Sequence, residues 1–260
     1  EQWSFVPSPA ADALLPLDQQ DVIRTAFIYK ASLVKPVGAS VVLNDSAFSN
    51  ARQPLAQAFT AADGTSAQFI AIVNHFKSKG SGTGADADQG DGQGASNASR
   101  VAQAHALVAF ADGLKTSVGT DKVFLLGDFN SYSQEDPIKV ITDAGYIQQG
   151  AEEYTYSFSG QSGSLDHIFA SPSAQAAVTG AHVWNINAGE SVALEYSRYN
   201  YNATDFYRAD AFRSSDHDPL VVGVTLSHKI ELNLLNINDF HGRIDGNTVA
   251  FAGTVEEQRA

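Results

Sequence analysis

The chain has 260 residues, 43% of them hydrophobic and 17% charged, a composition typical of a globular protein that buries a core. Its 29 acidic and 16 basic residues give a formal net charge of −13, opposite in sign to most non-specific DNA-binding proteins. Phosphate substrates are still compatible with this charge, because bound divalent cations reverse the local field. Cysteine is absent, which excludes disulfides and thiolate metal sites, and no apolar run is long enough to predict a membrane span.

The first quarter of the chain predicts β-structure after an irregular segment at residues 1–20. Runs rich in β-branched and aromatic residues predict strands at residues 21–30, 40–43, 54–59 and 68–76. The last two form a hairpin, and its second arm ends in Asn-His-Phe-Lys-Ser-Lys. A histidine at a strand end is often structural, but with lysines beside it His75 also suits an anionic oxygen.

A loop rich in glycine and aspartate follows at residues 80–94. Asp86, Asp88 and Asp91 are candidates for a Ca²⁺ site, although their spacing does not match an EF-hand, and a solvated loop is the alternative. A helix is predicted over residues 96–114, because its apolar residues recur at helical spacing and Gly113 is a plausible stop.

The central motif of the chain is Lys-Val-Phe-Leu-Leu-Gly-Asp-Phe-Asn at residues 122–130. Its apolar run predicts a buried strand, and Asp128 and Asn130 follow at alternate positions that point to one side of an extended chain. A carboxylate and an amide at the end of a buried strand suit a phosphate or an oxygen-liganded metal. A simple turn is the alternative, since Gly, Asp and Asn all favour turns.

The second half predicts a helix at residues 135–145, a hairpin and two later strands. The hairpin has arms at residues 155–159 and 164–170, and Asp166 lies in an otherwise apolar arm, where an ionisable group needs a partner. Asp216, His217 and Asp218 directly precede the strand at residues 220–226, a pattern that suits a general base or a metal site. Asp239 and His241 follow a strand at residues 230–237 and are typical of a divalent-metal site.

Four of these stretches, in this order, resemble the endonuclease/exonuclease/phosphatase (deoxyribonuclease-like) family, over roughly residues 20–226. They are Val73-Asn-His-Phe-Lys-Ser-Lys79, Leu125-Leu-Gly-Asp-Phe-Asn-Ser131, Ser164-Leu-Asp-His-Ile-Phe169 and Ser214-Ser-Asp-His-Asp-Pro219. The Asp/Gly loop and Asn97-x-x-Arg100-x-x-Gln103 are similar to secreted bacterial extracellular nucleases of that family. The resemblance implies an α/β (α+β) fold, a four-layer sandwich of two packed mixed sheets flanked by helices.

The activity that the resemblance implies is metal-assisted hydrolysis of phosphodiesters in DNA, with RNA as a further substrate, by a secreted or cell-surface protein. His217 would activate water and Asp166 would orient it, while His75 would donate to or polarise the phosphate. Asp128 and Asn130 would position water and stabilise developing charge. Asp216 would bind Mg²⁺ or Mn²⁺. We expect the remaining substrate contacts from Lys77, Asn97 and Arg100.

The tail of the chain resembles the opening of a 5′-nucleotidase-type metallophosphatase, in which Asp239 and His241 would bind metal. We therefore expect two domains, at residues 1–228 and 229–260, the second being only the start of a domain. The family's first metal-binding Asn and Glu lie upstream of the segment matched at residues 21–30, and residues 1–20 supply neither. We expect that the first strands of the fold are missing and that this piece alone is impaired.

Two other functions are compatible with the same residues. A phosphatase or a sphingomyelinase-type phosphodiesterase would use the same groups with a different pocket. A non-catalytic binding module would keep the fold, although it has no need of an acid–base set such as His75, Asp166 and His217. The sequence predicts no oligomeric state.

Overall fold

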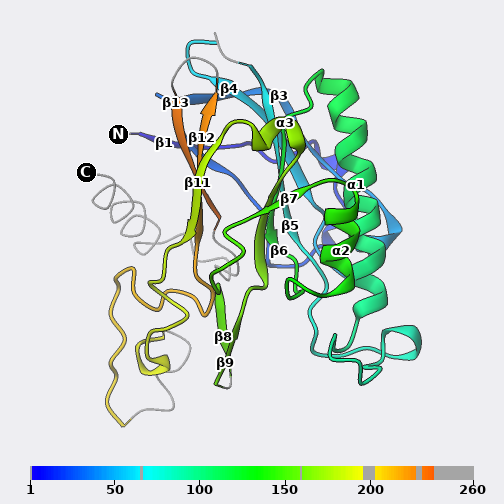
Figure 1. Cartoon of the computed structure of the whole chain (residues 1–260), viewed down its shortest axis with the longest axis vertical. Coiled ribbons are helices and arrows are strands. Elements are labelled where there is room, and N and C mark those ends of the chain that lie inside the picture. The colour runs from blue at the N-terminus through cyan, green and yellow to red at the C-terminus, as the bar shows by residue number, and fades with distance from the viewer. Residues whose placement is uncertain (1, 65–66, 159, 196–202, 227–229, 237–260) are drawn as a thin grey trace.

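The computed structural model describes residues 2–64, 67–158, 160–195, 203–226 and 230–236 (Figure 1). The strands are β1 Trp3–Phe5, β2 Ile28–Lys30, β3 Val34–Val42, β4 Leu55–Ala61, β5 Phe69–His75, β6 Val123–Asp128, β7 Ile147–Gln149, β8 Tyr156–Phe158, β9 Gln161–Gly163, β10 Asp166–Ala170, β11 Val178–Val183, β12 Leu220–Leu226 and β13 Ile230–Asn236. The α-helices are α1 Asn97–Val118, α2 Asp136–Asp143 and α3 Pro172–Gln175. No described helix is both long and apolar enough to cross a membrane.

The larger sheet has six strands in the order β3-β4-β5-β6-β10-β7. Its neighbours are antiparallel except β5 and β6, which are parallel because the long helix α1 connects them. All residues of β4, β5, β6 and β10 are buried, as expected for central strands that are covered on both faces. The sheet is therefore mixed, as the sequence predicted.

A second, antiparallel sheet, β11-β12-β13, packs against one face of the larger sheet. The core between them joins Phe69, Phe124 and Leu126 of the large sheet to Val222 and Val224 of β12. Side chains alternate along each strand, so the residues between these core positions point to the opposite face of the large sheet.

Helices α1 and α2 cover that opposite face (Figure 1). Leu107 and Ala111 of α1 and Ile141 of α2 pack there against Ile72 and Leu125. The mixed α/β class with a central mixed sheet is thus confirmed, whereas the described strands of the small sheet are all antiparallel and not mixed as predicted. In the part of the chain that the structure describes, α1 and α2 lie over the outer face of the larger sheet.

Three local predictions were wrong, because each depends on distant contacts. The strand at residues 21–30 is limited to β2, which pairs with β1. Helix α1 runs past Gly113 to Val118 and ends at Gly119, whose φ of 76° gives the left-handed C-cap. An interior helical glycine costs only about 1 kcal/mol, less than the packing of this helix contributes.

The third wrong prediction is the pairing of residues 155–170. Strand β8 pairs with β9, and the predicted second arm, β10, pairs with β6 and β7 in the large sheet. Burial explains the difference, because Asp166–Ala170 is fully buried and needs partners on both edges, whereas β9 is largely exposed.

The predicted domain division falls between β12 and β13. Strand β13 pairs antiparallel with β12, with Leu220 opposite Asn236 and Leu226 opposite Ile230. It therefore continues the small sheet of the first predicted domain. A separate domain in the tail stays a prediction, because residues 237–260, including Asp239 and His241, lie outside the described residues.

Candidate active site

Three of the predicted residues form one row across three neighbouring strands. His75 ends β5 and lies opposite Asp128 at the end of β6, and Asp128 lies opposite Asp166 at the start of β10. Each is two positions from a residue of the core between the sheets, namely Val73, Leu126 and Ile168. The row therefore continues that face of the sheet and stands where the space between the two sheets opens. All three side chains are buried, with 7%, 3% and 2% of their surface exposed.

The segment after β6 is a tight turn that fixes Asn130. Asp128 Oδ1 accepts the backbone N–H of Asn130 at 2.7 Å, and Asn130 Nδ2 donates to Asp128 Oδ2 and to the Phe76 carbonyl, both at 3.1 Å. Asn130 has a φ of 47°, which asparagine tolerates. Gly127 allows the close approach of β5, since a Cβ there would lie 2.0 Å from the Asn74 carbonyl oxygen. The motif at residues 122–130 therefore forms a turn and also places Asp128 and Asn130 in the candidate site, so the two alternatives are compatible.

His217 reaches the row from the loop before β12. Its Nδ1 lies 2.7 Å from Asp166 Oδ2, and Thr155 Oγ1 donates to the same carboxylate oxygen at 2.8 Å. The His217 backbone forms a bridge with Tyr156, whose ring lies 4.6 Å from the imidazole, centroid to centroid. Because the Asp166 carboxylate can only accept a hydrogen bond, His217 Nδ1 carries the donated proton. His217 Nε2 is therefore the ring nitrogen that can exchange a proton with water or substrate.

The adjacent His167 has a different use. It points to the helix side of the sheet, where its Nε2 donates to the Ser131 carbonyl at 2.7 Å and Gln148 Nε2 donates to its Nδ1 at 2.9 Å. Complete burial lowers its pKa, so it stays neutral. His167 therefore supports the turn after β6 and takes no part in the row.

The two site histidines differ in protonation at neutral pH, since His75 is uncharged and His217 is cationic. Burial, followed by the positive charges of Arg52 and His217, lowers the pKa of His75 to about 3, and the negative charges of Asp166 and Asp21 do not compensate. Asp128 Oδ2 lies 3.4 Å from His75 Nε2. Burial also disfavours a charged His217, but Asp166 outweighs this and raises the pKa of His217 to about 10. The site thus pairs a neutral imidazole with an imidazolium.

Arg52 is a site residue that the sequence analysis missed. It lies just before β4, and because Leu55 pairs with Val73, the chain around Arg52 runs beside His75. Its Nε is 3.1 Å from Asp21 Oδ2, and its side chain is 17% exposed. The sequence does show an arginine just before the strand that pairs with the His75 strand. Only the pairing register of these two strands shows that this arginine lies beside His75.

A second missed group, centred on Asn187, holds the His217 loop. Asn187 Nδ2 donates to the His217 carbonyl at 2.9 Å, and Arg213 Nη1 donates to the Asn187 carbonyl at 2.9 Å. Asp218 Oδ1 accepts the backbone N–H groups of Asn187 and Ala188 at 2.7 and 3.0 Å. Asp218 is therefore structural, which narrows the predicted Asp-His-Asp motif to its first two residues.

A model of the endonuclease/exonuclease/phosphatase family matches residues 9–217, which include every residue of this site. The chain belongs to this family. Its members are hydrolases that act on phosphoester bonds.

Similar solved structures were also found. A family protein from Bacteroides thetaiotaomicron is 16% identical, with a TM-score of 0.44, over 61% of this chain and 57% of that chain. A mannosyl-6-phosphatase from B. thetaiotaomicron is 18% identical, with a TM-score of 0.49, over 77% and 70%. D. rerio TDP2 complexed with a single-strand DNA product is 15% identical, with a TM-score of 0.40, over 60% and 62%. A search of curated proteins found no match.

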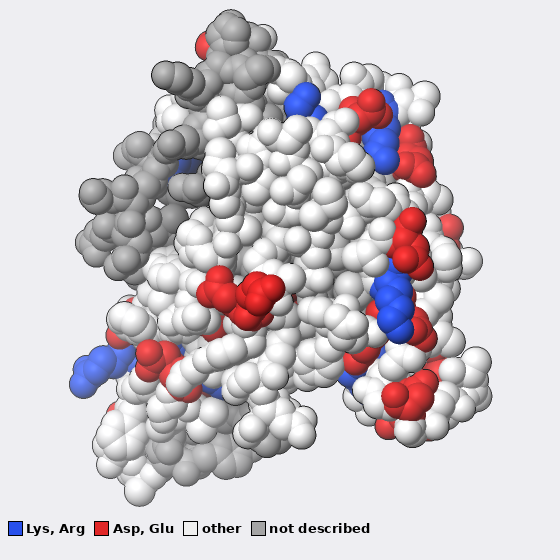
Figure 2. All heavy atoms as spheres, in the orientation of Figure 1, with Lys and Arg blue, Asp and Glu red and all other residues white. Residues whose placement is uncertain are grey.

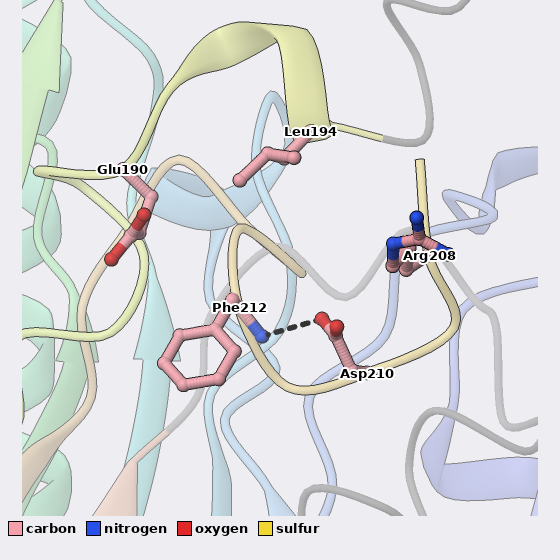
Figure 3. A pocket seen from close by; sticks show the side chains of 5 residues that line it. All are labelled: Glu190, Leu194, Arg208, Asp210 and Phe212. Atoms are coloured by element: carbon pink, nitrogen blue, oxygen red, sulfur yellow. Dashed lines mark hydrogen bonds between the residues drawn. The ribbon is translucent and has the colours of Figure 1, made fainter. Parts of the chain in front are cut away.

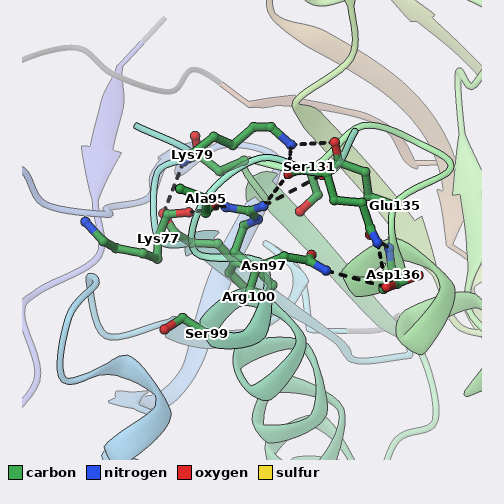
Figure 4. A network of polar contacts seen from close by, with 12 residues as sticks. Lys77, Lys79, Ala95, Asn97, Ser99, Arg100, Ser131, Glu135 and Asp136 are labelled. Atoms are coloured by element: carbon green, nitrogen blue, oxygen red, sulfur yellow. Dashed lines mark hydrogen bonds and ion pairs between the residues drawn. The ribbon is translucent and has the colours of Figure 1, made fainter. Parts of the chain in front are cut away.

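Of the predicted substrate-binding residues in this family member, Arg100 is fully buried. Its guanidinium donates to the carbonyls of Ala95 at 2.7 Å and Gln93 at 2.9 Å (Figure 4). It therefore holds the loop at residues 80–94 against α1, which is a different use from contact with substrate. Lys77 is half-buried, and its side chain extends away from this network (Figure 4).

Lys79 and Glu135 complete the network around that loop. Lys79 Nζ pairs with Glu135 Oε1 and donates to the Gln93 carbonyl at 2.6 Å. Burial lowers the pKa of Lys79 and raises that of Glu135, and their ion pair opposes both shifts. Asn97, at the start of α1, donates to Asp136 at 3.5 Å, so it too faces the network and not the row of His75.

The predicted Ca²⁺ loop uses its carboxylates locally. Asp86 caps α1 by accepting from Ser99 N at 2.8 Å and Ser99 Oγ at 2.5 Å. Asp88 and Asp91 each accept a backbone N–H two residues ahead. Among the described residues no group of three or more His, Asp or Glu side chains is placed to hold a metal ion. Ca²⁺ binding here stays a prediction.

Asp216 is the predicted Mg²⁺ or Mn²⁺ ligand. Its side chain is 35% exposed, and its Oδ1 lies 4.0 Å from His217 Nε2. Asp128 and Asp166 already accept from Asn130 and from His217 with Thr155. Asp216 is thus the partly exposed carboxylate beside His217, and the described residues on their own do not make a complete cation site.

A separate hollow of about 320 Å³ lies in the chain between β11 and β12 (Figure 3). Its lining residues are Glu190, Leu194, Arg208, Asp210 and Phe212. Asp210 accepts the Phe212 backbone N–H at 3.1 Å, and no residue of the acid–base set takes part in the lining. It is therefore distinct from the active site.

Proposed function

We propose that this chain comes from a secreted, divalent-metal-dependent nuclease that hydrolyses phosphodiester bonds of DNA, with RNA as a further substrate. The observation that supports this most is the buried row of His75, Asp128 and Asp166 with His217 bonded to it. Two histidines that differ in protonation and lie within electrostatic reach of each other are the means to take a proton from water and to give one to a leaving oxygen. A module that only binds has no need of such a pair.

His75 and His217 have the roles expected from the sequence, and bound substrate and metal would shift their pKa values toward those roles. An anionic phosphate beside His75 would raise the pKa of that imidazole from about 3 and let it hold a proton for the leaving oxygen. His217 must be neutral before it can act as a base, so its pKa must fall from about 10. A Mg²⁺ or Mn²⁺ ion at Asp216 would lower that pKa by charge repulsion and neutralise phosphate charge.

Other groups of the site would hold the phosphate. Arg52 lies beside His75 and presents a planar guanidinium, which suits bidentate contact with phosphate oxygens. Asn130 has both Nδ2 donors engaged, which fixes its side chain and leaves Oδ1 to orient water. Asp128 fixes the Asn130 turn and supplies negative charge next to His217.

The surface charge fits a site that depends on cations for its substrate. The chain carries a formal charge of −13. Figure 2 shows one face of the molecule, on which acidic side chains form small groups and basic side chains mostly lie beside them. That face has no basic stripe to attract a polyanion, so we expect weak binding of long DNA and a strong dependence of activity on divalent cations.

Nicking of supercoiled plasmid with Mg²⁺, by this chain and by a version extended upstream, each with and without EDTA, tests the proposal. His75→Ala and His217→Ala should each reduce the rate by at least about a hundredfold, the usual scale of acid–base assistance. His105→Ala is the matched control, since His105 is exposed on α1. Near-normal nicking by either site variant would remove its assigned role.

The same assay separates the alternatives. Hydrolysis of p-nitrophenyl phosphate without plasmid nicking would identify a phosphatase. Hydrolysis of sphingomyelin vesicles alone would identify a lipid phosphodiesterase. If neither this chain nor the version extended upstream turned over any of these substrates, although both were folded by circular dichroism, the non-catalytic binding module would be the remaining alternative.

A further inference from the structure

A cavity of about 190 Å³ lies between the N-terminal segment and the chain around Arg52. Its walls are largely apolar and include Leu14, Leu15 and Ile23. The Leu15 backbone N–H donates to Gln53 Oε1 at 3.3 Å, which holds the N-terminal segment over the entrance to β4. The cavity is thus a feature of the folded chain and is built from two distant segments.

This cavity borders the active site through Arg52, which lines it. Leu55 pairs with Val73, so the chain just before β4 runs beside His75, two residues beyond Val73. The charges of Arg52 and Asp21, another lining residue, both act on His75. A phosphate held between Arg52 and His75 would therefore carry one of its ester groups at the mouth of the cavity.

The lining limits what that ester group can be. None of the described lining residues is aromatic, whereas quaternary ammonium groups such as choline are usually held in aromatic cages. The volume is below the about 300–1,000 Å³ of pockets for drug-sized ligands, so a lipid chain does not fit.

We propose that the cavity receives one nucleobase of the substrate, adjacent to the phosphate between Arg52 and His75; this rests on the nuclease function proposed above. The apolar walls cover the faces of the ring, and the guanidinium group of Arg24 stacks on it or bonds its edge, while Arg52 holds the phosphate. Gln19, whose amide makes no hydrogen bond to the described residues, supplies a donor and an acceptor. A base enters only when unstacked, so single strands are preferred to duplex.

Calorimetry on the full chain with Mg²⁺ tests this without requiring turnover. The probes are thymidine 5′-monophosphate, deoxyguanosine 5′-monophosphate and 2-deoxyribose 5-phosphate, which has the same sugar and phosphate but no base. We expect at least one nucleotide to bind about tenfold or more tightly than the sugar phosphate. Leu15→Trp, which fills the cavity, and Gln19→Ala should each reduce that ratio by at least about threefold.

The matched control is Leu17→Trp, because Leu17 lies two residues further along the same segment and is 84% exposed. It should keep the full ratio. Gln19 is exposed, so its variant keeps the test decisive if Leu15→Trp does not fold. Equal binding of nucleotides and sugar phosphate, or a ratio unchanged in Gln19→Ala, would overturn the proposal. Plasmid nicking alongside either result would overturn the base cavity alone. Base-dependent binding with no nicking by this chain or by the version extended upstream would overturn only the nuclease function.

Discussion

The bond between Asp166 and His217 makes a quantitative prediction for Asp166→Asn. The amide keeps the shape of the carboxylate and can still accept from Nδ1, so the variant removes the charge and little else. Both side chains are almost fully buried, so solvent does not screen the pair. Without the carboxylate, burial lowers the pKa of His217 and the imidazole becomes neutral.

The magnitude follows from the pKa of His217. Its folded value of about 10 lies above the ordinary 6.5, so its contribution to stability is fully present below pH 6.5 and is lost as the pH rises through 10. At about 1.4 kcal/mol per pH unit, the contribution is about 5 kcal/mol in acid, about 4 kcal/mol at pH 7 and below about 1 kcal/mol at pH 10. Loss of one partner of a buried ion pair typically costs about 3–5 kcal/mol, which agrees.

Urea unfolding followed by tryptophan fluorescence, at several pH values from 6 to 10, measures this directly. The difference in unfolding free energy between wild type and Asp166→Asn should shrink steadily over that range. Asp218→Asn is the matched control, because Asp218 accepts from backbone amides and not from an imidazole, and its cost should not change with pH in this way. The reasoning would be refuted if the difference in unfolding free energy between wild type and Asp166→Asn were constant with pH, or were below about 1 kcal/mol at pH 7.

Three further outcomes are expected. The depressed pKa of His75 means that stability present above pH 6.5 is lost as the pH falls toward 3, and His75→Gln should flatten that limb by about 1.4 kcal/mol per pH unit; an unchanged acid limb contradicts this. Arg52→Lys keeps the charge but not the planar fork, so KM for a phosphodiester should rise about tenfold at near-constant kcat, and a loss confined to kcat argues against phosphate binding. Glu135→Gln leaves Lys79 without its carboxylate, so stability should fall by about 3–5 kcal/mol and residues 80–94 should be cut faster by protease; equal cleavage rates would show that the pair does not hold the loop.

The sequence was sufficient for those parts of the site that lie at the ends of strongly apolar strands. Asp128 follows a run that can only be a buried strand, and His75 ends a hairpin arm with clear β-propensity. An ionisable Asp166 inside an apolar strand had to have a partner, and the structure supplies His217 from 51 residues away.

The parts that could not be predicted depend on contacts between distant segments. Arg52 gains its meaning from the β4–β5 register, and Asn187 reaches the His217 loop from 30 residues away. Arg100 was predicted to contact substrate because its spacing matched a substrate-binding motif. In the structure it is buried, and its guanidinium donates to the carbonyls of Ala95 and Gln93. A residue pattern specifies the chemical group but not the solvent exposure that decides its use.

The row across β5, β6 and β10 also determines how the site can fail. Side chains alternate between the two faces of the sheet, so a slip of one residue in either strand pair would turn His75 or Asp166 toward α1 and α2. A slip in one pair alone would leave two of the three residues in the row and remove the third. The proposed catalysis therefore depends on both pairings, and recovered activity after refolding would report the alignment of three central strands at once.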